Sequence, residues 1–432
     1  MKLLMLYRKR WQLFYLPVIL CAAAALWWTS LRWQVLPPGK AVIAAGAQEG
    51  SYSRLAQRYA GQLERIGMQV EIVYSDTEKG SLDRLGNPQD AASIGFAHGI
   101  YAPGVQGVQA LAVVGHEPLW IFSSLNGPST LAQSRGLRIA AGPTAGSSYM
   151  AAQRVLSLAG VRASEVRFEA LSDTAAAEAL VDGKVDMLFQ VASDDSQVVQ
   201  LLTRMGGIQL LGVEYAGALA AQDRFLKPLL LPQGAIELRG DIPPRDLTLM
   251  SLQTHLLVRP DLHPALQRAL LDAAQEIHEI PTFLQHQRQF PNLRNSDFPM
   301  TLTAKAYSLG DRPWVETLLP YGKAQLAQLL LYAVIPILVV ALTVLAWIPK
   351  LFDWRVRAAL NHFYGELKFL ESEMEAIAST NPTALRSLLE RLDHIEHRVV
   401  EMDLPDEYSE RWYTLREHLS AAQERLLKLR VR

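Results

Sequence analysis

Two stretches of the sequence follow one plan: Ala41–Ala60 reads AVIAAGAQEGSYSRLAQRYA, and Leu137–Leu156 reads LRIAAGPTAGSSYMAAQRVL. Each begins with a short apolar run, continues through a loop of glycine and serine, and ends in an amphipathic helical pattern. The loops cover Gly46–Ser51 and Gly142–Ser148. Such a loop at the start of a helix directs backbone N–H groups, hydroxyls and the positive helix end to one point. Two such loops predict two α/β lobes that hold one small polar ligand.

The composition of the chain excludes several classes of function. Its 432 residues are enough for several domains, and a formal net charge of -1 provides no basic field for nucleic acid. The single cysteine, Cys21, lies in the first apolar run. The soluble part therefore has no disulfide, no cysteine-based zinc site and no thiol nucleophile. We expect no cofactor, no bound metal and no nucleic-acid partner.

Two apolar runs, Trp11–Trp28 and Leu326–Ile348, are long enough to cross a bilayer. At the rise of an α-helix they span roughly 27 and 34 Å, against a hydrocarbon core of about 30 Å. Basic residues precede the first run at Arg8–Arg10 and follow the second from Lys350 onward, which predicts that both termini are cytoplasmic. The main domain is then periplasmic, in a bacterial inner-membrane protein. A cleaved signal peptide, with its site in Ala22–Ala25, is the alternative for the first run.

Five parts are expected along the chain. They are a cytoplasmic basic tail at 1–10, a transmembrane helix at 11–31, a periplasmic two-lobed domain at 32–324, a second transmembrane helix at 325–348 and a cytoplasmic helical tail at 349–432. Within the domain, lobe 1 is expected at about 40–122 and 240–309 and lobe 2 at about 123–239.

Short apolar runs alternate with helical patterns through the domain, which indicates parallel sheets covered by helices. The predicted strands include Val108–Val114, Leu119–Ser123, Met187–Val191 and Leu252–Val258, the last of which returns to lobe 1. The tail instead carries apolar residues at spacings of three and four, beginning at Leu360, which predicts helices that close as a bundle or self-associate.

Several blocks of the sequence resemble the TAXI-type solute-binding proteins, the receptors associated with TRAP transporters. They include EKGSLDRL, SIGFAHG, GHEPLWIF, AEALVDGKVDMLFQ and FPNLRNSDFPMT, and the resemblance extends past the domain through LPYGKAQLAQLL and DWRVRAALNHFYGELKFLE, as in the membrane-anchored subgroup. It implies a type 2 periplasmic-binding-protein fold, a ligand that is a small organic acid or amino acid such as glutamate, and a TRAP-type permease as partner. The sequence departs from the family at Tyr52-Ser53, at the charged Asp76–Lys79, and in its attachment at both ends.

The candidate ligand-binding residues lie mainly in the loops at helix starts. In lobe 1 they are Gly46, Gln48, Gly50, Ser51, Tyr52, Gly80, Ser81 and His98, and in lobe 2 they are Thr144, Gly146, Ser147, Ser148, Gln190 and Asp194. Backbone N–H groups and hydroxyls at a helix start favour a carboxylate. The alternatives are a plain turn that needs glycine, a helix cap, or a structural histidine.

The sequence contains no recognisable motif of catalytic residues. His116-Glu117 lacks the second histidine of a zinc-protease motif, and no serine lies in G-x-S-x-G. We therefore expect a membrane-anchored solute receptor that feeds a permease, and not an enzyme. Two rivals stay open: a transmembrane sensor that signals through the cytoplasmic helices, and an envelope scaffold that binds no ligand.

Overall fold

The structure is a computed structural model that describes residues 11–32, 38–48, 50–376, 382–402, 404 and 406–431. The predicted basic tail at 1–10 lies outside these residues. The chain forms two compact units, Leu36–Gln325 and the combination of Met1–Val35 with Leu326–Arg432. We describe each unit by itself.

The larger unit is built on one mixed sheet of ten strands, in the order β2-β1-β3-β10-β4-β7-β5-β6, with β8 beside β4 and β9 beside β10. The strands are β1 (Lys40–Ala44), β2 (Gln69–Val73), β3 (Ile94–His98), β4 (Gln109–Ser124), β5 (Arg138–Ala140), β6 (Arg167–Glu169), β7 (Met187–Val191), β8 (Ile208–Leu210), β9 (Leu226–Leu231) and β10 (Leu247–Val258).

Two long antiparallel strands, β4 and β10, divide this sheet into two lobes. The second half of β10 pairs with β3, while its first half pairs with β9. The end of β4 pairs with β7 and β8. We call the β1–β3 side lobe 1 and the β5–β9 side lobe 2. The register between β4 and β10 shifts at Thr254/His255, where the strands pass from one lobe to the other.

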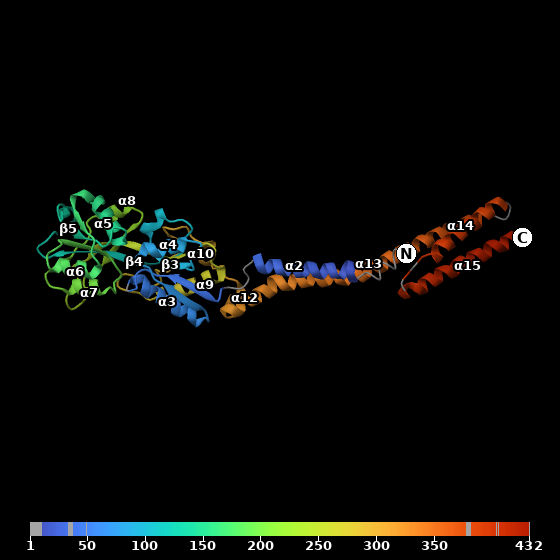
Figure 1. Ribbon diagram of the computed structural model, residues 1–432, viewed down its shortest axis with the longest axis horizontal. Coiled ribbons are helices and arrows are strands. Elements are labelled where there is room, and N and C mark those ends of the chain that lie inside the picture. The colour runs from blue at the N-terminus through green and yellow to red at the C-terminus, as the bar shows by residue number, and fades with distance from the viewer. Residues whose placement is uncertain are drawn as a thin grey trace. The chain divides into compact units, whose positions relative to one another are not determined.

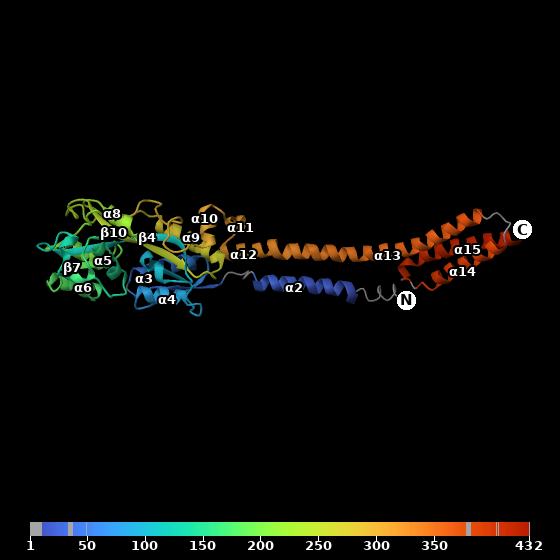
Figure 2. The ribbon, with the colours of Figure 1, turned by 90° about the horizontal axis from the view of Figure 1, so that it is seen from above.

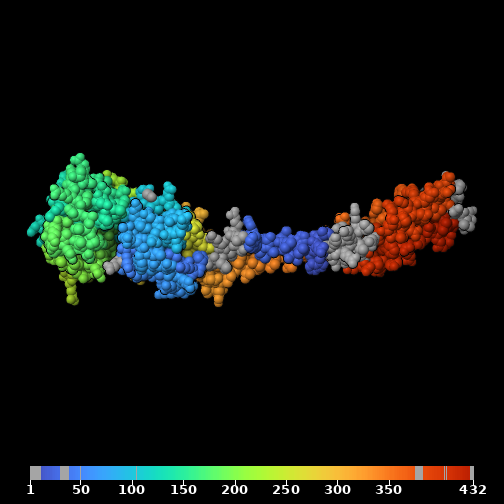
Figure 3. Space-filling view, viewed as in Figure 1, coloured from blue at the N-terminus to red at the C-terminus, as the bar shows by residue number. Residues whose placement is uncertain are grey.

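Helices cover both lobes (Figure 1). Their buried apolar residues form the cores together with the strands. Lobe 1 carries α3 (Ser51–Arg65), α4 (Glu78–Gly86), α9 (Pro264–His278), α10 (Leu302–Ser308) and α11 (Trp314–Leu318), and lobe 2 carries α5 (Ser147–Leu158), α6 (Asp173–Val181), α7 (Gln197–Arg204) and α8 (Ala216–Gln222). In the space-filling view lobe 2, in green, and the first part of lobe 1, in blue, meet along one boundary (Figure 3).

The smaller unit is helical. It contains η1 (Trp11–Tyr15), α2 (Leu16–Arg32), η5 (Leu330–Val334), α13 (Ile335–Ala376), α14 (Pro382–Val400) and α15 (Ser409–Val431), and α12 (Tyr321–Leu329) leads into it from the larger unit. Two helical stretches, Trp11–Thr29 and Tyr321–Met374, are long and apolar enough to cross a membrane, and each contains an 18-residue window with a mean hydropathy of 1.5 and 2.8, respectively. The C-terminal part of α13 shares a core with α14 and α15 that includes Leu367, Leu392 and Leu419.

The predicted fold class is confirmed: two α/β lobes joined by two crossing strands, two apolar helices, and a helical C-terminal region. The two predicted strands Val108–Val114 and Leu119–Ser123 are in fact one strand, because β10 pairs with β4 through the intervening Gly115–Pro118 segment. The second apolar run also does not end a helix at Ile348, since α13 continues to Ala376.

Candidate functional site

A cavity of about 270 Å³ lies between the lobes, at the starts of several helices. Lobe 1 contributes the loop after β1 and the first turns of α3 and α4, and lobe 2 contributes the loop after β5, the first turn of α5 and the segment after β7. This position follows from the parallel strands on each side, whose carboxyl ends meet at the cleft. The residues that line this cavity include Gly50, Ser51, Glu78, Gly146, Ser147, Asp173 and Ser193.

The helices α3 and α5 begin at this cavity with glycine in the N-cap position. Gly50 and Gly146 both have extended backbones, and no described side chain caps either helix. A Cβ atom at Gly50 would lie 3.1 Å from the carbonyl oxygen of Ala47, and one at Gly146 would lie 3.1 Å from that of Pro143. The tight loops therefore favour glycine, and they leave first-turn N–H groups without a side-chain acceptor.

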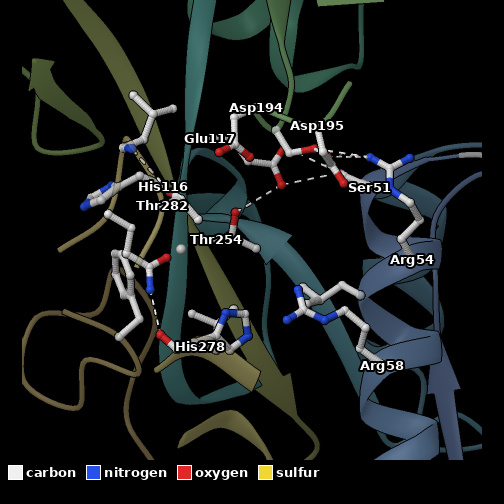
Figure 4. Close-up of a pocket in the computed structure, with 17 residues that line it drawn as sticks. Ser51, Arg54, Arg58, His116, Glu117, Asp194, Asp195, Thr254, His278 and Thr282 are labelled. Atoms are coloured by element: carbon white, nitrogen blue, oxygen red, sulfur yellow. Dashed lines mark hydrogen bonds and ion pairs between the residues drawn. The ribbon is translucent and has the colours of Figure 1, made fainter. Parts of the chain in front are cut away.

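A second cavity of about 190 Å³ adjoins the first. Ser51, Arg54 and Ser193 line both cavities. Figure 4 shows both arginines extending from α3: Arg54 reaches toward Asp195, and Arg58 reaches into the second space on the side of His278. The interlobe cleft is thus divided into two compartments at Arg54.

Two contacts cross the cleft directly. The Arg54 guanidinium donates to the Ser193 hydroxyl at 3.2 Å and to the Asp195 carboxylate at 3.0 Å. Tyr101, which follows β3, donates to the Glu78 carboxylate at 3.1 Å and lies at the same distance from the carbonyl oxygen of Ala145 in lobe 2. The contacts with Ser193, Asp195 and Ala145 join side chains of lobe 1 to loops of lobe 2.

A buried charged network forms the floor of the cleft. The fully buried His98 lies between two carboxylates, with Nδ1 3.4 Å from Glu78 Oε2 and Nε2 3.3 Å from Glu117 Oε2. The hydroxyls of Ser51 and Thr254 each donate to Glu117 Oε1 at 3.3 Å. Glu117 is on the crossing strand β4 and Thr254 is on β10, so the network is attached to both strands that join the lobes.

The protonation of this network is set by its opposite charges. Burial alone would lower the pKa of His98, but the carboxylates of Glu78 and Glu117 raise it to about 10. Burial would likewise raise the pKa of Glu78, but the charge of His98 and hydrogen bonding lower it below its ordinary value. We therefore treat His98 as an imidazolium that is shared by two carboxylates at neutral pH.

Besides Arg54 and Arg58, the cleft carries three further carboxylates. Asp76 and Asp173 line the first cavity and Asp194 lines the second, and none of the three forms an ion pair with a described residue. Burial, together with the neighbouring Asp195 and Glu117, raises the pKa of the Asp194 carboxyl. The cleft thus combines helix starts that favour an anion with carboxylates that favour a cation.

Residues 98–305 match the model of the NMT1-like family. The match runs from the end of β3 to α10 and includes all of lobe 2 and both crossing strands. No curated protein shows a significant sequence match to this chain.

Solved structures with detectable similarity are distant in sequence. The periplasmic aliphatic sulphonate binding protein SsuA from Escherichia coli is 15% identical over 55% of this chain and 69% of that chain, with a TM-score of 0.36. The alkanesulfonate-binding protein SsuA from Xanthomonas axonopodis pv. citri, bound to MOPS, is 16% identical over 57% and 81%, with a TM-score of 0.33. The GluR0 ligand-binding core from Nostoc punctiforme, in complex with L-glutamate, is 12% identical over 55% and 92%, with a TM-score of 0.35.

The structure brings eight of the sequence-predicted site residues to the two cavities. The first cavity is lined by Gly46, Gly50, Ser51, Tyr52, Gly146, Ser147 and Ser148, and the second by Ser51 and Asp194. Ser148 also has a structural partner, because its hydroxyl accepts a hydrogen bond from the Val191 N–H at 2.9 Å. The other predicted residues line neither cavity: Gln48, Gly80, Ser81, His98, Thr144 and Gln190. Of these, His98 lies beneath the cleft and contacts two of its carboxylates.

Sequence reasoning missed the charged residues of the cleft, chiefly Arg54, Glu78, Glu117 and Asp195. Arg54 and Glu78 lie in first turns of helices, where a charged residue is ordinarily solvated. For Arg54 a local signal was its position just after the predicted loop Gly46–Ser51, and for Glu78 it was the unusual charge of the segment Asp76–Lys79.

Proposed function

We propose that this chain is a membrane-anchored solute receptor, and not an enzyme, whose two lobes bind a small amino acid or organic acid in the interlobe cleft. The observation that carries the proposal is the pair of glycine-capped helix starts, α3 from lobe 1 and α5 from lobe 2, at one cavity. A carboxylate placed between Ser51 and Ser147 would accept hydrogen bonds from both lobes, and would therefore favour the closed arrangement.

The charges of the cleft favour an amino acid over a simple organic acid. The N–H groups at the two helix starts would bind the carboxylate of the solute, whereas Asp173 and Asp194 would provide negative charge for its ammonium group. A plain dicarboxylate could pair with Arg54 or Arg58, but it would leave Asp173 and Asp194 without a partner of opposite charge. A zwitterion satisfies both features of the site.

The proposed setting is the bacterial inner membrane. The two apolar helices support attachment at both ends, with the larger unit periplasmic and both termini cytoplasmic. The resemblance to TAXI-type receptors supports a TRAP-type permease as the partner that reads the closed receptor. These assignments of partner, orientation and anchoring are part of the proposal.

The proposal is tested by thermal unfolding of the full chain in nanodiscs with a panel of amino acids and their deaminated counterparts, such as alanine with propionate and glutamate with glutarate. A ligand that binds only the native state stabilises it by about 2.7 kcal/mol at a hundredfold excess over its dissociation constant. We expect a higher unfolding midpoint with an amino acid and a smaller effect of its deaminated counterpart. A cooperatively folded chain that no solute stabilises would contradict the receptor proposal and favour the scaffold.

A pair of serine variants on one helix localises the effect. Ser147→Ala removes a hydroxyl at the cavity, whereas Ser157→Ala removes an exposed hydroxyl near the other end of α5. The ligand-induced shift should fall in Ser147→Ala and persist in Ser157→Ala. Equal shifts in both variants would place the bound solute elsewhere.

A second candidate function, sensing, is favoured by one feature of the smaller unit. The helix α13 runs without a break from the apolar run into the tail, where its residues Leu360 and Leu367 belong to the three-helix core. A displacement of the apolar helix would therefore reach the tail core directly. Ligand-dependent cross-linking between cysteines introduced at the exposed Phe369 of two chains would support sensing, and cross-linking that ligand leaves unchanged would count against it.

A further inference from the structure

Lobe 1 carries an exposed apolar surface on α10, α11 and the loops that follow them. Its large side chains are strongly exposed: Leu302 83%, Leu309 85%, Trp314 56%, Leu318 71% and Leu319 39%. We call these five residues the ledge. In Figure 2, α10 and α11 lie at the end of the larger unit that is farthest from α6 and α7 of lobe 2. Large apolar side chains exposed to this degree within one short segment, 302–319, indicate a contact surface.

The ledge is firmly held on lobe 1. Glu316 of α11 accepts two hydrogen bonds from the Arg268 guanidinium of α9, at 2.7 and 2.5 Å, and a third from the Gln325 amide at 2.8 Å. Between the exposed side chains, Ala304 and Val315 are buried against the lobe. The ledge therefore moves with lobe 1 as one body.

We propose that the ledge rests in the interfacial layer of the lipid bilayer. Leu319, its last residue, is separated by a short segment from Leu326, where the apolar run begins, so the chain itself keeps the ledge near the membrane. Tryptophan and leucine are suited to that layer, and the exposed Lys305 and Lys323 suit anionic headgroups. The inference rests on the proposed membrane anchoring and adds a second, peripheral contact to it.

If the ledge contacts the bilayer, the two lobes have different roles. Lobe 1 is fixed at the bilayer by the ledge, and lobe 2 is the part that moves when the cleft closes. A permease would then meet a lobe 1 of constant orientation, with the ligand-dependent change carried by lobe 2.

The test places a fluorescent probe at single cysteines in the full chain, reconstituted in phosphatidylcholine–phosphatidylglycerol vesicles with and without doxyl-labelled lipid, in a Cys21→Ser background. Leu309→Cys and Leu318→Cys report on the ledge. Leu238→Cys is the matched control, because Leu238 is 87% exposed between β9 and β10 in lobe 2. Val339→Cys reports on the apolar run. All four positions are exposed, so the labels do not displace core side chains.

We expect a loss of emission with doxyl lipid at Leu309, Leu318 and Val339, and none at Leu238. Loss at Val339 alone would overturn the ledge proposal while leaving the membrane span intact. Loss at the ledge without loss at Val339 would support the ledge and contradict the span. A ledge probe that is shielded from water but insensitive to doxyl lipid would show a protein on this surface, and would also overturn the proposal.

Discussion

The guanidinium of Arg54, on α3 of lobe 1, lies 3.0 Å from the carboxylate of Asp195, which follows β7 in lobe 2. Both side chains are about half exposed, at 45% and 61%. An ion pair of this exposure contributes about 0–1 kcal/mol, so it can form and break without a large cost. The pair is therefore suited to a reversible contact between the lobes, as the proposed binding of a solute requires.

Loss of this contact should shift the lobes apart. Double electron–electron resonance would measure the distance between spin labels at Gln57→Cys on α3 and Ser157→Cys on α5. In Arg54→Gln we expect this distance distribution to shift to longer values. Arg58→Gln is the control, because Arg58 is on the same helix but donates to the Ile277 carbonyl within lobe 1, at 2.9 Å. Identical distributions in the two variants would show that the pair does not influence the lobes.

The buried His98 predicts a pH dependence of stability. The pKa of His98 rises from an ordinary 6.5 to about 10 in the folded chain. Its stabilisation is therefore fully present below pH 6.5 and is lost as the pH rises through about 10. Removing one member of a buried ionic group costs about 3–5 kcal/mol, so His98→Gln should be less stable at pH 6.5 and lose less stability toward pH 10. The test is the thermal unfolding midpoint of the larger unit, measured from pH 6 to 10 in the wild-type chain and in His98→Gln. Midpoints that change with pH in parallel in the two chains would contradict the predicted role of His98.

The side chain of Trp120 connects the crossing strand β4 to the segment after β7 that lines the cleft. Its buried indole N–H donates to the Ala192 carbonyl at 3.0 Å, directly before Ser193. Trp120→Phe should cost about 1–3 kcal/mol, because it leaves that carbonyl without its donor and leaves a void. Hydrogen exchange at residues 192–196 should also increase. Phe122→Leu, a buried change on the same strand, should destabilise the unit without that local increase; a local increase in both variants would argue against the link.

The helical tail should unfold separately from the larger unit. Adjacent residues of α15 provide a matched pair, since Leu426 is 1% exposed in the three-helix core and Leu427 is 46% exposed. Leu426→Ala should destabilise the tail by about 2–5 kcal/mol, whereas Leu427→Ala should have little effect. Hydrogen exchange should rise in α14 and α15 and stay unchanged in the sheet. An increase that spreads into the sheet would show that the two units unfold together.

Much of the fold follows from local patterns in the sequence. The strand Met187–Val191 has the predicted bounds, and α3 and α5 begin within the predicted loops Gly46–Ser51 and Gly142–Ser148, because apolar periodicity and Gly-Ser loops are local signals. The strand Leu226–Leu231 was missed, since Pro228 within it argues against a strand. The continuity of β4 was missed because it depends on pairing with β10, more than a hundred residues later in the chain.

The candidate site was less accessible from sequence. The loops around Gly50 and Gly146 could be predicted from the sequence, because their composition alone indicates a turn followed by a helix start. The meeting of Glu78, His98 and Glu117 was not, because these residues come from three elements that only the folded sheet brings together. Arg54 appears in sequence as an ordinary residue of an exposed helix face, and its partner Asp195 belongs to the other lobe.

The central claim, a two-lobed receptor that closes on a small zwitterion, is tested most directly by the distance between the lobes. The Gln57→Cys, Ser157→Cys chain, spin-labelled in nanodiscs in the Cys21→Ser background, would be measured with and without a pool of amino acids. We predict a shorter and narrower distance distribution with the pool, and no such change when Ser147→Ala is added. A distribution that amino acids leave unchanged, in a chain that is folded, would contradict the account.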